Sequence, residues 1–324
     1  MEETTTSQPQ VTRSSSGIVG GNVVEPEDDP SAPFPGGPID RSLLKSFKDH
    51  VAAAIWNNEH RSLLKCINHG AQIAEWDLQS CHPDTQGLQR IIQRSGLAPL
   101  IDCSYRKANK EVISAFVEWW QSETNTFHLP FGEMSITLED VSILLKIPVT
   151  GKVVAVENFS RYTEESRKDA IELVSKLLGV SPDEAEEEVN ITKGLTMRVV
   201  WLKSRFCPPK SKSSSTSSSP TTYPQVECTA RAYFLYLLSC TLFADKSGSR
   251  VSISLLKLLE NLDEVGTYAW GAAALAYLYH HLGSATKVEV SQIAGYLTLL
   301  EVHISCALLV NRPIQIQYFF FNFC

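Results

Sequence analysis

The segment 231–243 constrains the fold of this chain more than any other part of the sequence. It reads RAYFLYLLSCTLF, so a helix built from it is apolar around almost its whole circumference. Such a helix is stable in water only when other elements cover every side of it. It is also shorter than the roughly 20 apolar residues that a membrane-spanning helix needs. We therefore expect 231–243 to be the central, buried helix of a globular core.

Apolar residues recur at helical spacing in many other segments, which predicts a mainly α, multi-helical globular domain. Gly96, Gly179 and Gly283 are expected to end the helices that precede them. In the segment 195–206 we expect Met197, Val200 and Trp201 to face inward. The predicted helices are 40–55, 85–95, 111–121, 163–178, 195–206, 251–262, 270–282 and 293–309.

A further helix is predicted to begin after Ser181. A serine followed by Pro182 is typical of the first residues of a helix, and the acidic residues that follow suit its N-terminal end. The acidic run 184–188 belongs to this helix. We expect that run to form a solvated face of the helix, not a metal site.

The stretch 127–154 predicts a hairpin followed by a capped helix. Gly132 separates two short extended runs, 128–131 and 133–136, and its freedom to take a positive φ suits a tight hairpin.

Thr137 and Asp140 have the spacing of a capping box and predict a helix over 138–146. Pro148 cannot continue that helix, because it has no N–H to donate. A turn at Thr150-Gly151 and a short strand at 153–156 are expected to follow.

Two segments have compositions that do not support a packed core. Residues 1–39 are rich in Ser, Thr, Pro, Gly and acidic residues, so we expect a disordered N-terminal tail. Segment 208–224 contains SKSSSTSSSP and is predicted to be an exposed Ser-rich loop.

The net charge of −7 argues against a general binder of phosphate backbones, whose affinity comes from clustered Lys and Arg. The N-terminus has neither the basic nor the apolar region of a signal peptide, and no apolar run is long enough to span a membrane. These observations predict a nuclear or cytosolic protein. We expect its eight cysteines to be buried or free thiols and not disulfides.

Four residues could in principle bind zinc: Cys66, His69, Cys81 and His82. Their spacing matches no common zinc pattern, and adjacent Cys and His residues rarely chelate one ion well. We therefore expect ordinary thiols and turn histidines, and no metal. The pair Gly151-Lys152 lacks the other residues of a nucleotide-binding P-loop. The pair His280-His281 is expected in the last turn of its helix, where cations suit the helix dipole.

Arg231, Asp245 and Lys246 are polar members of an otherwise apolar block that also contains Trp270. Two interpretations of these four candidate residues stay open. The polar members form an ion pair and a turn that fix helix packing, or they contribute to a recognition surface.

Several motifs in this block resemble the plant mobile domain in family order. They are RAYFLYLL at 231–238, LFADKSG at 242–248, YAWGAAAL at 268–275 and GYLTLL at 295–300. Upstream, CINHG at 66–70, Trp76 and ETNTFHLP at 123–130 are similar to MAIN-like (maintenance of meristems) proteins, which carry this domain. The resemblance covers roughly residues 40–300, and we expect the domain to span 40–310. The chain departs from the family pattern at its end, in the segment 311–324. The resemblance therefore implies an atypical, C-terminally truncated end.

The resemblance implies a nuclear, non-enzymatic protein with roles in transposable-element silencing, genome stability and meristem maintenance. The implied partners are a phosphatase-like nuclear protein and chromatin-associated factors. The family is also called aminotransferase-like, but pyridoxal phosphate needs a Schiff-base lysine and a phosphate-binding loop, and neither is present, so we expect no cofactor. Two alternatives stay open: a transposon-derived accessory protein that binds nucleic acid, and an enzyme whose activity depends on polar residues near Arg231 or Asp245.

Overall fold

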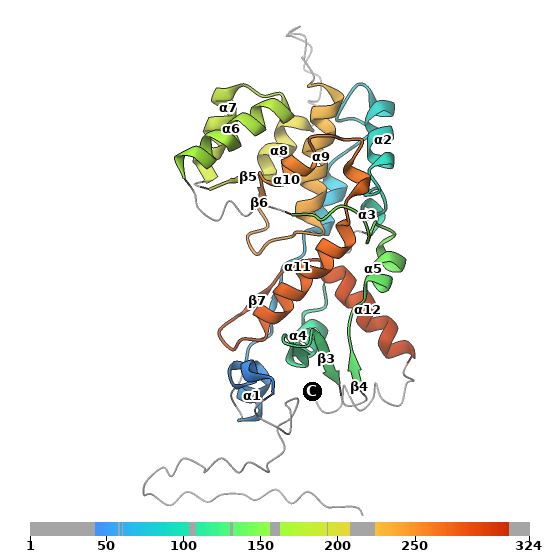
Figure 1. Cartoon of the computed structure of the whole chain (residues 1–324), viewed down its shortest axis with the longest axis vertical. Coiled ribbons are helices and arrows are strands. Elements are labelled where there is room, and N and C mark those ends of the chain that lie inside the picture. Colours follow the sequence, from blue (N-terminus) through green and yellow to red (C-terminus); the bar gives the residue numbers. More distant parts are fainter. Residues whose placement is uncertain are drawn as a thin grey trace, which may run out of the picture.

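The computed structural model describes residues 43–57, 59, 61–103, 108–129, 132–155, 163–192, 194–207 and 224–310. The predictions for 1–39, 208–223 and 311–324, and those for Asp40 and Val156, lie outside the described residues. Within them the chain is mainly α with a few short strands, which confirms the predicted fold class (Figure 1).

The α-helices are α1 (Val51–Trp56), α2 (Thr85–Arg94), α3 (Pro99–Asp102), α4 (Lys110–Glu118), α5 (Leu138–Leu145), α6 (Glu164–Leu178), α7 (Pro182–Thr192), α8 (Val199–Phe206), α9 (Val226–Cys240), α10 (Leu255–Leu258), α11 (Trp270–Ala285) and α12 (Leu297–Val310). Short 3₁₀ helices are η1 (Lys45–Asp49), η2 (Gly70–Glu75) and η3 (Val265–Thr267). The strands are β1 (Lys65–Cys66), β2 (Trp120–Gln121), β3 (Thr126–Leu129), β4 (Gly132–Met134), β5 (Thr196–Arg198), β6 (Arg250–Ser252) and β7 (Gln292–Ile293).

Helix α9 lies at the centre of the core, as predicted from its all-round apolar sequence. From Cys228 to Cys240 every residue except Arg231 is buried. Helices α2, α6 and α8 pack around it (Figure 1). The helix begins at Val226, five residues before the apolar run. Its first turn is only partly buried and can therefore include polar residues such as Glu227.

The stretch 127–154 joins the hairpin to the long helix α11. Thr137 and Asp140 form the expected capping box at the start of α5. Beyond α5, the carbonyl of Pro148 accepts a hydrogen bond from the Gly271 N–H at 2.7 Å, at the first turn of α11. Helix α11 then runs from this junction toward the β2–β3–β4 sheet (Figure 1).

The hairpin differs from the prediction in its register and in its number of strands. Leu129 pairs with Gly132, so this glycine is the first residue of β4 and not the centre of the turn. Its φ of 134° still requires a glycine. Trp120 and Gln121, predicted as the end of a helix, form β2 and pair with Phe127 and Thr126.

Two predicted helices begin as strands instead. Residues 196–198 pair with 250–252 in an antiparallel ribbon, β5–β6, before α8 and α10 begin. The prediction of helix over 195–206 was therefore wrong in its first part. Because α8 starts only at Val199, a different set of its residues faces the core than we expected from a helix that begins at residue 195. Val200 is therefore 72% exposed instead of facing inward.

Glycines mark helix ends only where the local contacts allow it. Gly179 ends α6 in a left-handed conformation, as predicted, and Gly96 follows α2 with a φ of 71°. Gly283, by contrast, lies inside α11, which continues to Ala285. A Cβ at Gly283 would lie 3.2 Å from Cβ of Ser122, so this glycine serves close packing against the segment after β2.

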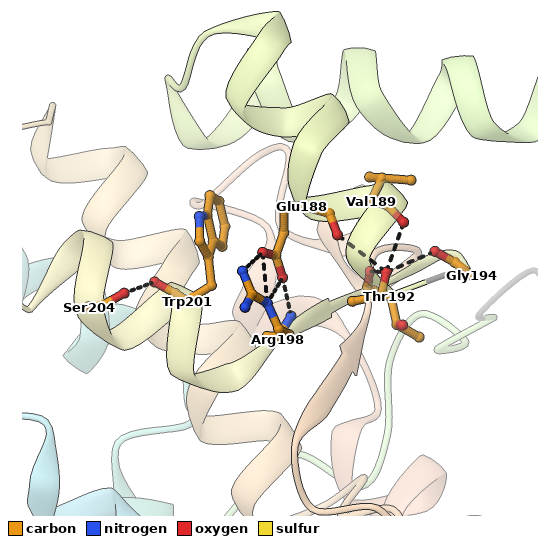
Figure 2. Close-up of polar contacts among 8 residues, drawn as sticks. Glu188, Val189, Thr192, Gly194, Arg198, Trp201 and Ser204 are labelled. Carbon is orange, nitrogen blue, oxygen red and sulfur yellow. Dashed lines mark hydrogen bonds and ion pairs between the residues drawn. The ribbon is translucent and has the colours of Figure 1, made fainter.

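The acidic run 184–188 is not a uniformly solvated face, which corrects the prediction. Glu188 is only 1% exposed, and both of its carboxylate oxygens accept hydrogen bonds from Arg198 (Figure 2). Its Oε1 also accepts the backbone N–H of Arg198 at 2.6 Å. Beside this pair, Thr192 Oγ1 donates to the carbonyl of Thr196 at 2.7 Å. These contacts fix β5 against the last turns of α7.

Candidate functional site

A cavity of about 440 Å³ opens beside α11, and it contains one of the candidate residues, Asp245. The end of α9, the turn at 243–245, the β5–β6 ribbon and α11 enclose it. Its lining is mostly apolar and includes Phe243, Leu255 and Tyr277, with the two charged groups Asp245 and Arg250 among them. An apolar cavity with a few fixed polar groups is typical of binding sites.

The turn that carries Asp245 is fixed by the carboxylate itself. Asp245 Oδ1 accepts the Gly248 N–H at 2.7 Å, and Oδ2 accepts a hydrogen bond from Ser247 Oγ at 2.8 Å. The backbone at Gly248 has a φ of 62°, and a Cβ there would lie 2.0 Å from Cε1 of His69. The turn therefore rests on the His69 ring and holds the carboxylate at the cavity. Lys246 is exposed.

Arg231 acts in packing and lies away from the cavity lining. Its guanidinium donates to the carbonyls of Leu259 at 3.0 Å, Glu260 at 2.9 Å and Leu177 at 3.3 Å. It thereby ties the end of α6 and the segment after α10 to α9. Asp245 makes its hydrogen bonds within its own turn, so Arg231 and Asp245 take part in two separate sets of contacts.

Trp270 supports the cavity from behind. Its side chain is completely buried, and the indole N–H donates to the carbonyl of Val265 at 2.7 Å. Its ring centroid lies 6.4 Å from that of Phe243, which lines the cavity. Of the two candidate residues in this block, Asp245 lines the cavity directly, whereas Trp270 packs against the lining residue Phe243.

Arg250 and Tyr277 were not singled out from the sequence. Arg250 lies in β6, and its Nη1 donates to the carbonyl of Thr192 at 3.0 Å. Burial, helped by the nearby Asp245 carboxylate, raises the pKa of Tyr277 to about 12. The only available sequence indication for Arg250 was its position directly after the Ser-Gly-Ser turn, where a strand can begin.

His281 packs edge-on against Tyr277, with ring centroids 4.5 Å apart. Burial lowers the pKa of His281 to about 4, and the neighbouring His280 and Lys246 act in the same direction, whereas Asp245 opposes it. Because α11 extends to Ala285, this histidine is not in the last turn, and the predicted cation at the helix end was wrong.

We expect the free energy of unfolding to fall as the pH drops from about 6.5 to about 4. In this window the unfolded chain binds a proton at His281 that the folded chain does not bind, and stability is full above it. After allowance for partial solvent screening, the loss from this group is about 1–2 kcal/mol. Urea unfolding across this pH range, compared between the chain and the variant His281→Phe, measures it. Parallel curves for the two proteins would contradict the assignment, since other histidines are common to both.

The four residues considered as zinc ligands do not form a cluster. His82 Nε2 donates to the carbonyl of Pro224 at 2.9 Å, and Cys66 Sγ lies 3.8 Å from the carbonyl of Leu64. Among the residues that the structure describes, no three His, Cys, Asp or Glu side chains come together as metal ligands. Lys152 forms an ion pair with Glu264, so it acts in packing of the loop and not as a P-loop lysine.

No helix in the described ranges has the length and apolar composition to cross a bilayer. The described cysteines are all free thiols, as predicted. No solved structure matches the chain significantly.

Comparison with known proteins gives consistent matches over most of the chain. The family model for the plant mobile domain matches residues 96–318. Protein MAIN-LIKE 1 of Arabidopsis thaliana is 37% identical over 279 residues, which is 86% of this chain and 50% of that protein. Protein MAINTENANCE OF MERISTEMS of the same plant is 34% identical over 267 residues, covering 82% of this chain and 50% of that protein.

A third relative, named serine/threonine-protein phosphatase 7 long form homolog, also from Arabidopsis thaliana, is 34% identical over 280 residues. This match covers 86% of the chain but only 19% of that relative. The chain thus spans about half the length of the first two relatives and a smaller part of the third. By the extent of these matches, the chain belongs to the plant mobile domain family.

Proposed function

We propose that this chain is a non-enzymatic nuclear protein that acts through protein–protein interaction, and that the cavity beside α11 receives a short segment of a partner protein. The observation that carries the proposal is the presence of one acidic and one basic group in the lining of a mostly apolar cavity of about 440 Å³. This volume suits a few side chains, and buried apolar anchors flanked by charges are typical of specific protein contacts.

The chemistry of the cavity defines the segment that it would bind. Asp245 is held by its own turn and Arg250 by the carbonyl of Thr192, so both charges are oriented before a partner arrives. A matching segment has an apolar side chain for the surface around Phe243 and Tyr277. It also carries a basic and an acidic group for the two fixed charges.

The comparisons support the kind of partner and the process. A region similar to this chain forms 19% of a relative named as a phosphatase homolog, while other relatives carry MAIN-like names. A domain shared in this way fits an interaction module that works with a phosphatase-like nuclear partner or with chromatin-associated factors. We propose that the chain acts in the processes that its resemblance to MAIN-like proteins implies, which are transposable-element silencing, genome stability and meristem maintenance.

Affinity purification of the tagged chain from plant nuclei tests this proposal. We expect the chain to recover a phosphatase-related or chromatin-associated protein, and we expect Arg250→Glu to lower that recovery at least tenfold. Lys287→Glu is the matched control, because it makes the same charge change at a different cavity, lined also by Ser284 and His280. It should leave recovery unchanged.

The proposal would be contradicted if both variants lost recovery equally. It would also be contradicted if the tag alone recovered the same proteins and the chain were located in the cytosol. Circular dichroism of the variants separates a lost contact from a lost fold. Salt-sensitive binding of purified chain to DNA in a shift assay would instead favour the nucleic-acid alternative, which the net charge of −7 disfavours.

A further inference from the structure

Two cysteines that are 126 positions apart meet at the edge of the core, where the ends of two segments converge. Cys81 lies in the loop between η2 and α2, and Cys207 directly follows α8. They are 3% and 8% exposed. Both contact the carbonyl oxygen of Asp77: Cys81 donates its N–H at 3.0 Å, and Cys207 Sγ lies at 3.9 Å. Cys81 Sγ lies 3.8 Å from the carbonyl oxygen of Leu78, and the two thiols are close enough to shift each other's pKa.

The pKa values of the two thiols are shifted in opposite directions. The contact with Cys81 lowers the pKa of Cys207, and the same contact together with burial raises the pKa of Cys81. Cys207 is therefore the thiol of this pair that ionises first as the pH rises, whereas Cys81 stays protonated. A thiolate beside a second thiol is the arrangement from which a disulfide forms on oxidation.

We propose that Cys81 and Cys207 are a redox modification site, at which oxidation by a peroxide forms a reversible disulfide that ties the end of α8 to the loop after η2. The Cys207 thiolate attacks one peroxide oxygen, the O–O bond breaks, and hydroxide leaves, which forms a sulfenic acid. The Cys81 sulfur then attacks the Cys207 sulfur, the S–OH bond breaks, and the hydroxide takes the Cys81 proton as water. In total, two thiols and one hydrogen peroxide give one disulfide and two waters.

The other buried thiols are in different surroundings. Burial raises the pKa of Cys66 and of Cys240 to about 12, and it also raises the pKa of Cys228. Cys240 donates to Gln72 Oε1 and not to a second sulfur. These thiols stay protonated at neutral pH and have low reactivity toward peroxide. The pair at Cys81 and Cys207 is thus distinguished by both contact and acidity.

The position of the pair gives the disulfide a structural consequence. The residue after Cys81, His82, donates from Nε2 to the carbonyl of Pro224, just before α9. Cys81 and His82 therefore contact the chain on both sides of the Ser-rich segment, at Cys207 and at Pro224. The disulfide would make one of these two contacts covalent.

Peroxide treatment of the reduced full chain, followed by alkylation and peptide mapping, tests the proposal. We expect a peptide pair joined through Cys81 and Cys207, a mass lower by two hydrogen atoms, and full reversal by dithiothreitol. Cys207→Ser should abolish the product, and Cys81→Ser should leave a sulfenic acid at Cys207 that dimedone traps. Cys228→Ser, an equally buried control, should leave the disulfide unchanged.

The pH dependence gives a second readout that does not require a variant. Between pH 7 and 8.5 the rate should rise by less than the more than tenfold increase expected of a thiol of ordinary pKa, because Cys207 ionises at a lower pH. Oxidation of Cys207 to the sulfinic acid in the unmutated chain without a cross-link, or a disulfide between other cysteines at the same peroxide dose, would overturn the proposal.

Discussion

Replacing Arg198 by alanine is expected to lower the free energy of unfolding by about 3–5 kcal/mol. The reason is the position of its partner: Glu188 is 1% exposed and accepts hydrogen bonds from Arg198 Nη2 at 2.6 Å and from Nε at 3.0 Å. Without the guanidinium, the core retains a carboxylate with only the backbone N–H of residue 198 as a charge-stabilising donor. Urea unfolding of the purified chain measures the loss.

A double-mutant cycle separates the buried charge from other effects of the substitution. Glu188→Gln removes the charge, while Arg198, whose side chain is 43% exposed, can still reach water. We therefore expect the double variant Arg198→Ala with Glu188→Gln to be more stable than the sum of the single losses predicts. Lys176→Ala is the control, because its ion pair with Glu260 is exposed and such pairs contribute little. Additive losses would show that Arg198 acts only through its packing.

The parts of the fold that depend on neighbours in sequence could be predicted from it. The Thr137–Asp140 capping box and the Gly179 terminator each involve residues within one or two helical turns, and both are present. The central helix was also predictable, since a segment apolar all round has no alternative to burial.

The parts that depend on distant partners could not be predicted in the same way. Residues 196–198 and 250–252 carry apolar residues at spacings that also suit helices, and only their pairing with each other makes them strands. The same holds for Glu188, which reads as one of five acidic or small residues on a helix until β5 brings Arg198 to it. The cavity depends on this ribbon as well, which is why the sequence singled out Asp245 as a candidate residue but not Arg250.

Gly151 gives the second large prediction, because the junction between 148–152 and the start of α11 needs a residue without a side chain. Its φ is 132°, and a Cβ there would lie 2.2 Å from the carbonyl oxygen of Thr267. That oxygen is held in place, since it accepts the Lys152 N–H at 2.8 Å, and the Lys152 carbonyl in turn accepts the Ala269 N–H at 2.9 Å. Relief of the clash must break at least one of these backbone hydrogen bonds.

We therefore expect Gly151→Ala to lower the free energy of unfolding by about 4 kcal/mol, as the sum of conformational strain and lost backbone hydrogen bonds. Gly132→Ala is a matched control, because Gly132 has nearly the same φ, 134°, but within the described part of the chain no non-neighbouring atom lies within 4 Å of its Cβ position. It should cost only the strain, about 1–2 kcal/mol. Urea unfolding of both variants measures the difference. Equal losses would mean that φ alone requires glycine at position 151; a larger loss for Gly151→Ala is expected because the Thr267 carbonyl cannot move without releasing the start of α11.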